Sequence, residues 1–182
     1  MNLSLRSLCM TDLDPMVQLT NDPDVIFFVP GMIRDREGLA SWIEHMSSRD
    51  HEFVITLDSV PIGECSLTEK QDNTGEIGIM LFPEYWRKGY GTEAVGKLII
   101  LAEELKLKTL TATTLQLNEP CIRLFEKLGF SKQAVGWVLD DKIDIQAPLK
   151  ELYGMVVFEK ELQEGDENND ISNGGKRTEK AE

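Results

Sequence analysis

Apolar and polar residues alternate or cluster in short segments through the first half of the chain. Residues 3–6 alternate with a period of two, as a half-buried strand does. Three further apolar segments, at residues 53–57, 62–68 and 76–82, are separated by short polar turns. Segments joined in this way predict a three-strand antiparallel meander.

Two short helices are predicted between the first strand and the meander. Asp12 is placed to cap the first, which runs through Leu19 and ends before an Asn-Asp-Pro-Asp turn at residues 21–24. Asp35 is placed to cap the second, in which apolar residues recur at helical spacing.

The second half of the chain alternates between helical and extended patterns. The predicted elements are a helix at 91–105, a strand at 109–117, a helix at 118–128 and strands at 130–138 and 152–159. Gly129 is expected to end the second of these helices in a left-handed conformation. We therefore predict an α/β fold with a mixed (α+β) sheet: an antiparallel N-terminal meander, then strand-helix-strand-helix and two C-terminal strands.

The composition changes at residue 163. Residues 163–182 contain only Ile171 and Ala181 as apolar side chains, too few to offset the entropy lost on ordering. We expect one folded domain at residues 1–162 and an acidic disordered tail at 163–182. The tail has six acidic and three basic residues, so residues 1–162 keep −10 of the total net charge of −13.

Charge and composition disfavour several classes of protein. The 182 residues are 41% hydrophobic, enough to form a core without metal or disulfide cross-links. The net charge of −13 disfavours nucleic acid and anionic membranes as partners and favours an amine-bearing one. The three cysteines have no Cys-x-x-Cys spacing, which predicts reduced thiols and no metal site.

The apolar runs are short. None exceeds five residues, whereas a membrane span needs about 20. Residues 1–6 also lack the basic start and long apolar stretch of a secretion signal. We expect a soluble, cytoplasmic protein. Its oligomeric state stays open, with a homodimer as one alternative.

The segment at residues 82–94 joins the fourth predicted strand to the long helix. Gly89 and Gly91 in it permit positive φ and the close approach of a ligand to the backbone amides. The free N–H groups at a helix start attract anions, and Arg87 and Lys88 add positive charge. A pyrophosphate fits this pattern, as does an ordinary structural turn. A dinucleotide-binding fold fits poorly, because the third glycine is missing.

A second motif follows one strand later. Residues 118–130 read Asn-Glu-Pro-Cys-Ile-Arg-Leu-Phe-Glu-Lys-Leu-Gly-Phe, and residues 89–94 read Gly-Tyr-Gly-Thr-Glu-Ala. Together they resemble the acetyl-CoA signature of the GNAT superfamily of N-acetyltransferases, in particular its RimJ/RimL-like branch. The likeness in element order covers about residues 3 to 160. It implies a GNAT-like fold that uses acetyl-CoA as cosubstrate.

The same resemblance assigns residues to the cofactor. The backbone of Met80, Leu81 and Phe82 is expected to pair with the pantetheine arm. The pyrophosphate is expected to bind the amides of Arg87, Lys88, Gly89, Tyr90, Gly91 and Thr92. Asn118 is similar to the family asparagine near the thioester, and Cys121, Leu124 and Phe125 are expected to line the groove. From the residues alone, Asn118 is equally a helix cap and Phe125 equally a core residue.

Acetyl transfer needs a neutral amine. Near pH 7 a lysine-like amine, with a pKa of about 10.4, costs roughly 4.6 kcal/mol to deprotonate, whereas an α-amine costs only about 1 kcal/mol. The resemblance places Glu76 where an acidic residue faces the cleft, and a buried carboxylate there accepts the amine proton. Glu64 in the preceding strand is a second candidate. Glu76 is alternatively a plain edge or turn residue.

The group that protonates the leaving thiolate is unassigned. Many GNAT members have Tyr where this chain has Phe125, and Phe has no proton to give. RimL-like members often have Ser in place of Cys121, whose thiol donates weakly. Many also have Arg or Gln at the position of Trp86. Tyr90, Cys121 and water therefore stay alternatives as the acid.

The sequence thus predicts an enzyme that transfers an acetyl group from acetyl-CoA to a primary amine, directly and in a ternary complex. The RimJ/RimL likeness suggests a protein N-terminal α-amine, with a polyamine, an amino acid or an antibiotic amine as alternatives. A noncatalytic acetyl-CoA-binding module and a cofactor-free structural protein are further alternatives. Residues 21–46 and 139–150 are expected to border the acceptor; their candidate acids are Asp22, Asp24, Asp140, Asp141 and Asp144.

Overall fold

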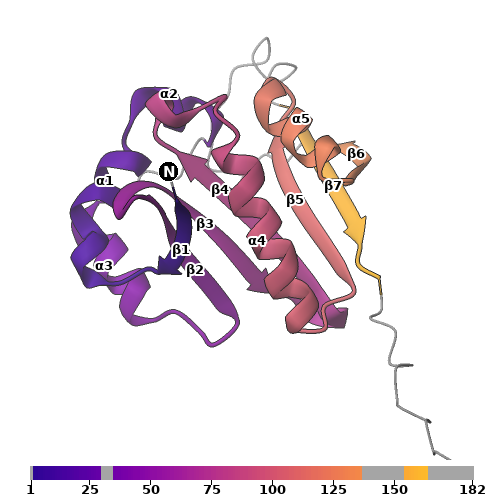
Figure 1. Cartoon of the computed structure of the whole chain (residues 1–182), viewed down its shortest axis with the longest axis horizontal. Coiled ribbons are helices and arrows are strands. Elements are labelled where there is room, and N and C mark those ends of the chain that lie inside the picture. The colour runs from indigo at the N-terminus through magenta and orange to yellow at the C-terminus, as the bar shows by residue number, and fades with distance from the viewer. Residues whose placement is uncertain (1, 30–34, 137–153, 164–182) are drawn as a thin grey trace, which may run out of the picture.

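A computed structural model describes residues 2–29, 35–136 and 154–163 (Figure 1). The predicted tail at 163–182, apart from its first residue, and the predicted acceptor loop at 139–150 lie outside these ranges. The strands are β1 (Leu3–Ser7), β2 (Asp50–Leu57), β3 (Val60–Glu69), β4 (Thr74–Leu81), β5 (Thr109–Leu115), β6 (Ser131–Gly136) and β7 (Met155–Glu161). The α-helices are α1 (Leu13–Thr20), α2 (Pro23–Phe28), α3 (Arg36–Glu44), α4 (Tyr90–Glu104) and α5 (Glu119–Lys127). Short 3₁₀ turns lie at Met10–Asp12, Gln71–Asn73 and Pro83–Tyr85.

The strands form one seven-stranded sheet in the order β1-β2-β3-β4-β5-β7-β6. Every neighbouring pair is antiparallel except β4 and β5, which are parallel. These two strands pair only between residues 74–77 and 109–112, although β4 continues to Leu81. Beyond the paired stretch the sheet is open between β4 and β5. The predicted mixed sheet and its antiparallel meander are confirmed.

Each face of the sheet has its own apolar core. Helix α4 lies across one face (Figure 1) and packs with Ile55, Ile77 and the aromatic side chains of β7 and α5. Helices α1, α2 and α3 contribute to a second core that contains Val54 and Met80. Successive side chains of a strand point to opposite faces, so Val54 and Ile55 separate into different cores.

The local helix signals are mostly confirmed. The Asp35 side chain accepts a hydrogen bond from the Gly38 amide at 2.6 Å and caps α3. Gly129 has φ +81° and ends α5 in the left-handed region, as predicted. The turn predicted at residues 21–24 is wrong in part, because Asp22 caps helix α2 by accepting from the Asp24 and Val25 amides. Asp followed by Pro suits a turn and also the first position of a helix.

Within the described ranges, no helix has the length and apolar character needed to cross a membrane. The same residues contain no group of three or more His, Cys, Asp or Glu side chains arranged to hold a metal ion.

Candidate active site

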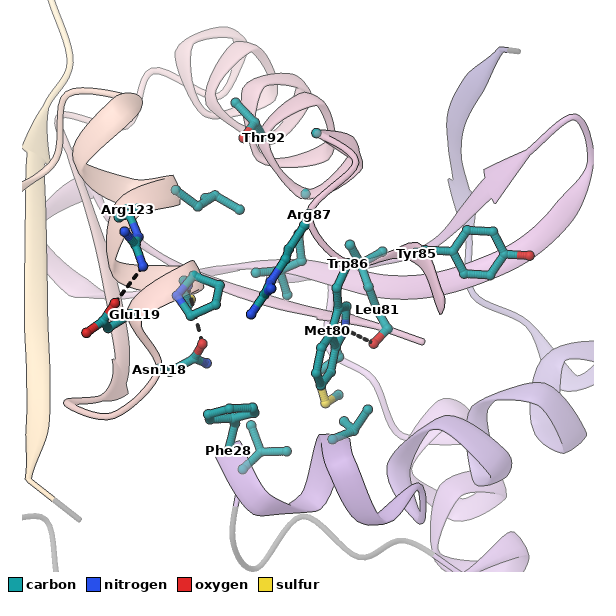
Figure 2. A pocket seen from close by; sticks show the side chains of 18 of the residues that line it. Phe28, Met80, Leu81, Tyr85, Trp86, Arg87, Thr92, Asn118, Glu119 and Arg123 are labelled. Carbon is teal, nitrogen blue, oxygen red and sulfur yellow. Dashed lines mark hydrogen bonds and ion pairs between the residues drawn. The ribbon is translucent and has the colours of Figure 1, made fainter. Parts of the chain in front are cut away.

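A cavity of about 880 Å³ opens where β4 and β5 separate (Figure 2). Its lining comes from α2, the end of β4, the turn before α4, the first turn of α4, and α5 over its whole length together with the residues just before it. The lining residues are Val25, Phe28, Val29, Ile79, Met80, Leu81, Tyr85, Trp86, Arg87, Gly89, Gly91, Thr92, Leu117, Asn118, Glu119, Pro120, Cys121, Arg123, Leu124 and Lys127. The two sequence motifs therefore meet at one site.

The turn before α4 is built from residues in the left-handed region. Arg87 has φ +58° and Gly89, which caps α4, has φ +88°. A residue other than glycine in this region costs of order 1 to 3 kcal/mol, and such strain is common at functional sites. Alternating left- and right-handed residues turn successive amides toward one side, where they bind anions. The Arg87 side chain reaches into the cavity between Asn118 and Trp86 (Figure 2).

The other residues predicted for the pyrophosphate differ in their placement. Thr92 lines the cavity, whereas Lys88 is exposed, does not line it and lies 5.7 Å from the centre of the Tyr85 ring. Tyr90 also lies outside the lining and packs near Tyr85, with ring centres 6.2 Å apart. Of the two glycines that permit positive φ, only Gly89 adopts it: Gly91 lines the cavity from within α4, in the right-handed region.

The end of β4 presents backbone groups to the opening. The Phe82 amide donates to the Ile62 carbonyl at 3.0 Å, so Phe82 is bonded to β3. Antiparallel pairs alternate, so the backbone groups of Met80 also point to β3 and those of Ile79 and Leu81 point into the opening. The Leu81 carbonyl accepts a hydrogen bond from Trp86 Nε1 at 2.7 Å.

This alternation corrects the predicted set of pantetheine-pairing residues. Phe82 is only 8% exposed, is bonded to β3 and does not line the cavity. Met80 lines the cavity, but with its side chain. The sequence prediction missed Ile79, whose amide and carbonyl lie on the open edge beside the Leu81 amide. The alternation of residues along the strand could have shown that Ile79 and Leu81 direct their backbone groups to one side and Met80 directs its own to the other.

Helix α5 forms the opposite wall. The Asn118 side chain accepts from the Cys121 amide at 3.3 Å, so Asn118 caps the helix and also lines the cavity. Cys121 and Leu124 follow at spacings of three and face the same cavity. Phe125 does not: it is 2% exposed and packs against Phe158, with ring centres 5.5 Å apart. The predicted groove role of Phe125 is wrong, because the next position of the helix turns toward the sheet.

The Cys121 thiol lies beside Thr114. Burial raises the pKa of this thiol, and a hydrogen bond with the Thr114 side chain opposes that rise in part. The protonated thiol is therefore the form present near neutral pH. The Cys121 thiol therefore suits the role of a weak proton donor or of a packing group, and not that of a thiolate nucleophile.

Two cations on α5 were missed from the sequence. Arg123 and Lys127 line the cavity with Arg87, and Arg123 is 2.5 Å from the Glu119 carboxylate one turn earlier. Their spacing of four residues on one helix face was the available signal. Among the described lining residues, Glu119 is the only carboxylate.

Glu76 does not have the surroundings that were predicted for it. Its side chain is 47% exposed and lies 2.9 Å from Lys70 Nζ. It lies within the stretch where β4 and β5 are still paired, and it does not line the cavity. The cleft begins farther along the strand. The expectation of a buried carboxylate facing the cleft is therefore wrong for Glu76.

Glu64 is the buried carboxylate in this region. It is 6% exposed and lies opposite Met80 in the register of β3 and β4. Of the predicted acceptor acids, Asp22 caps α2 and Asp24 is exposed, and neither lines the cavity. Asp140, Asp141 and Asp144 lie outside the described residues.

A family model described as "Acetyltransferase (GNAT) domain" matches residues 2–131. The chain belongs to the GNAT acetyltransferase family. The Bacillus licheniformis protein p20, described as an uncharacterized N-acetyltransferase, is 29% identical over 147 residues, which cover 73% of this chain and 81% of p20. The prediction of a GNAT fold and of an acetyltransferase enzyme is confirmed.

Two solved structures share the fold at low identity. The spermidine N-acetyltransferase of Vibrio cholerae, solved with CoA and spermine, has a TM-score of 0.74 at 18% identity and covers 87% of this chain and 95% of that one. YncA of Salmonella typhimurium, solved with its cofactor acetyl-CoA, has a TM-score of 0.72 at 19% identity and covers 91% and 96%. At this identity the two likenesses show the fold; membership of the acetyltransferase family rests on the family model, and acetyl-CoA is the cofactor that YncA holds.

The residues present fit this cofactor. The left-handed turn at Arg87 and Gly89 offers amides and a cation to phosphates. The open edge at Ile79 and Leu81 offers amide donors and a carbonyl acceptor to an extended amide chain.

Proposed function

We propose that this GNAT enzyme acetylates the α-amine of a peptide or protein N-terminus, as a RimJ/RimL-like member would, by direct transfer in a ternary complex. The observation that carries the proposal is one cavity reached from both faces of the sheet. Ile79 and Leu81 line it from the α4 face, and Met80 lines it from the α1–α3 face. Cofactor and acceptor then approach the same point from opposite sides.

Direct transfer is supported by the state of the cavity's thiol. Among the described lining residues, Cys121 is the only cysteine, and its raised pKa keeps it protonated near neutral pH. A thiol in this state is a poor nucleophile, so a covalent acetyl-enzyme is disfavoured. The amine nitrogen instead bonds to the acetyl carbon, the carbon–sulfur bond breaks, and coenzyme A leaves as the thiol after taking a proton.

An α-amine acceptor is supported by the lining. The only carboxylate among the described lining residues is Glu119, which is paired with Arg123. A lysine-like amine costs roughly 4.6 kcal/mol to deprotonate near pH 7, and an α-amine costs about 1 kcal/mol. The site thus suits an acceptor that loses its proton without a strong base.

As the group that accepts the proton of the acceptor amine, we propose Glu64 in place of Glu76. Glu64 is buried on the face where the acceptor enters and lies one strand from Met80, which lines the cavity. It would take the amine proton through a water molecule. Glu76 is half-exposed and paired with Lys70, and it lies in the stretch where β4 and β5 are still paired.

The test is release of coenzyme A thiol by the full chain with acetyl-CoA and four kinds of amine: short peptides with a free N-terminus, the same peptides blocked at the N-terminus but containing lysine, spermidine, and an aminoglycoside. We expect turnover with the free peptides, with mass spectrometry locating the acetyl group on the α-nitrogen. Faster turnover of spermidine or the aminoglycoside than of the free peptides would show that the acceptor belongs to another class of amine. Coenzyme A binding without turnover of any amine would support the noncatalytic alternative.

A further inference from the structure

Helix α2 supplies an apolar wall to the half of the cavity where the acceptor enters. Val25 and Phe28 line the cavity from this helix, and Val29 lines it from the position directly after the helix. They belong to the core on the α1–α3 face or lie next to it, as do Met80 and Trp86. Figure 2 shows Phe28 on the side of the cavity away from Thr92, which stands at the start of α4.

Two aromatic rings hold this wall in place. Phe28 and Trp86 meet edge to face, with ring centres 6.0 Å apart and planes at 66°. The Trp86 ring is itself fixed by its hydrogen bond to the Leu81 carbonyl at 2.7 Å. The wall is therefore formed before an acceptor arrives.

The charges around the cavity favour an apolar acceptor over a polycation. Three cations line it, Arg87, Arg123 and Lys127, and the described lining offers no carboxylate beyond the paired Glu119. Among the described lining residues, a polyamine would find no unpaired carboxylate for its amines and would meet an apolar wall at α2. An acceptor with one amine and an apolar neighbour meets a surface that it can bury.

We propose that Val25, Phe28 and Val29, together with Met80 and Trp86, form a subsite for an apolar side chain next to the acceptor amine, so that the enzyme selects peptides with a large apolar first residue. This inference rests on the proposed acetylation of an α-amine. It adds a preference for the first residue of the acceptor peptide, and Phe28 is the main determinant of that preference.

Phe27 provides a matched control. It is the same residue type on the same helix, is 48% exposed and does not line the cavity. Phe28→Ala removes the wall, and Phe28→Leu keeps an apolar side chain there. Phe27→Ala removes a ring that packs edge to face on Phe28, with ring centres 5.0 Å apart, but leaves the residues that line the cavity in place.

The experiment measures kcat/KM of the full chain for peptides that differ only in their first residue, which is Gly, Ser, Leu or Phe, with spermidine as a further acceptor. We expect the Leu and Phe peptides to exceed the Gly peptide at least tenfold, in the range that one apolar side chain contributes to specificity. Phe28→Ala should reduce this ratio to about threefold or less, while Phe28→Leu and Phe27→Ala keep most of it. The KM for acetyl-CoA should stay unchanged in all three variants.

The possible failures are distinguishable. Equal kcat/KM for all four peptides, or a Leu-to-Gly ratio that Phe28→Ala leaves unchanged, overturns the subsite and leaves the proposed function standing. Turnover of spermidine with none of the peptides overturns the proposed function and the subsite with it. A loss of the ratio in Phe27→Ala equal to that in Phe28→Ala shows a general disturbance of α2 and also overturns the subsite.

Discussion

A Cβ atom placed on Gly91 would lie 2.8 Å from Cδ1 of Leu124, closer than real Cβ contacts come. Gly91 is the second residue of α4 and Leu124 lies on α5, so the missing side chain lets the two helices meet beside the cavity. Helix α4 can therefore begin directly at the phosphate-binding turn while α5 closes the other wall.

Gly96→Ala lies in the same helix as Gly91 with no atom within 4 Å of an added Cβ, and should stabilise the protein by about 0.5 to 1 kcal/mol. Gly91→Ala should lose this gain and lower the free energy of unfolding by up to about 2 kcal/mol, because the Leu124 methyl group must shift. In a Leu124→Ala background, Gly91→Ala should be less unfavourable, because the clashing methyl group is absent. Urea unfolding of each single variant and of the double variant measures this coupling, and equal effects of alanine at positions 91 and 96 would contradict the packing role.

Arg87 and Lys88 are neighbouring cations with different surroundings. Both are exposed, but Arg87 lines the cavity, whereas Lys88 does not and lies near the Tyr85 ring. Arg87→Ala should raise the Kd for coenzyme A about tenfold or more, since a charge-assisted hydrogen bond contributes about 1.5 to 3 kcal/mol. Lys88→Ala should change it less than threefold. Titration calorimetry at two salt concentrations checks both, and the reverse order would place the phosphates elsewhere.

The two glutamates are separable by conservative substitution. Glu76→Gln should leave kcat/KM within about twofold, because an exposed ion pair such as Glu76–Lys70 contributes at most about 1 kcal/mol. Glu64→Gln should lower kcat/KM for a peptide α-amine about tenfold, a small effect for general base catalysis because the α-amine deprotonates easily. Unchanged coenzyme A binding in Glu64→Gln shows that the fold is intact. Activity that falls in Glu76→Gln alone would contradict the assignment.

Cys121 makes stability depend on pH in the alkaline range. Burial raises the pKa of its thiol in the folded chain above its ordinary value of about 8.5. Below that value the thiol is protonated in both the folded and the unfolded chain, and its contribution to the free energy of unfolding is fully present. As pH rises through it, the unfolded chain loses its proton first, so the free energy of unfolding falls.

Cys121→Ala should reduce this alkaline loss of stability, measured by urea unfolding between pH 7 and 10. Cys65, whose thiol pKa burial also raises, provides a second such group, so Cys65→Ala should act in the same direction. Cys9→Ala, at an exposed position, serves as the control for the removal of a thiol. A steeper loss in Cys121→Ala than in the parent chain would contradict the raised pKa.

The sequence by itself determined the elements and the family. Side-chain alternation specified the meander, and the capping residues Asp35, Asn118 and Gly129 specified helix ends, because these preferences act over a few neighbouring residues. The two motifs at residues 89–94 and 118–130 indicated acetyl-CoA through their likeness to the family signature, and both lie on one cavity.

Only the tertiary structure decided which of these residues face the cavity. Phe125 lies one position from Leu124 yet packs in the core, and Glu76 lies before the point where β4 leaves β5. Gly91 is required by the approach of α5 rather than by its own backbone angles. The Phe28–Trp86 wall joins two segments that are far apart in the chain. Such relationships depend on where strands separate and helices cross, and no local pattern encodes them.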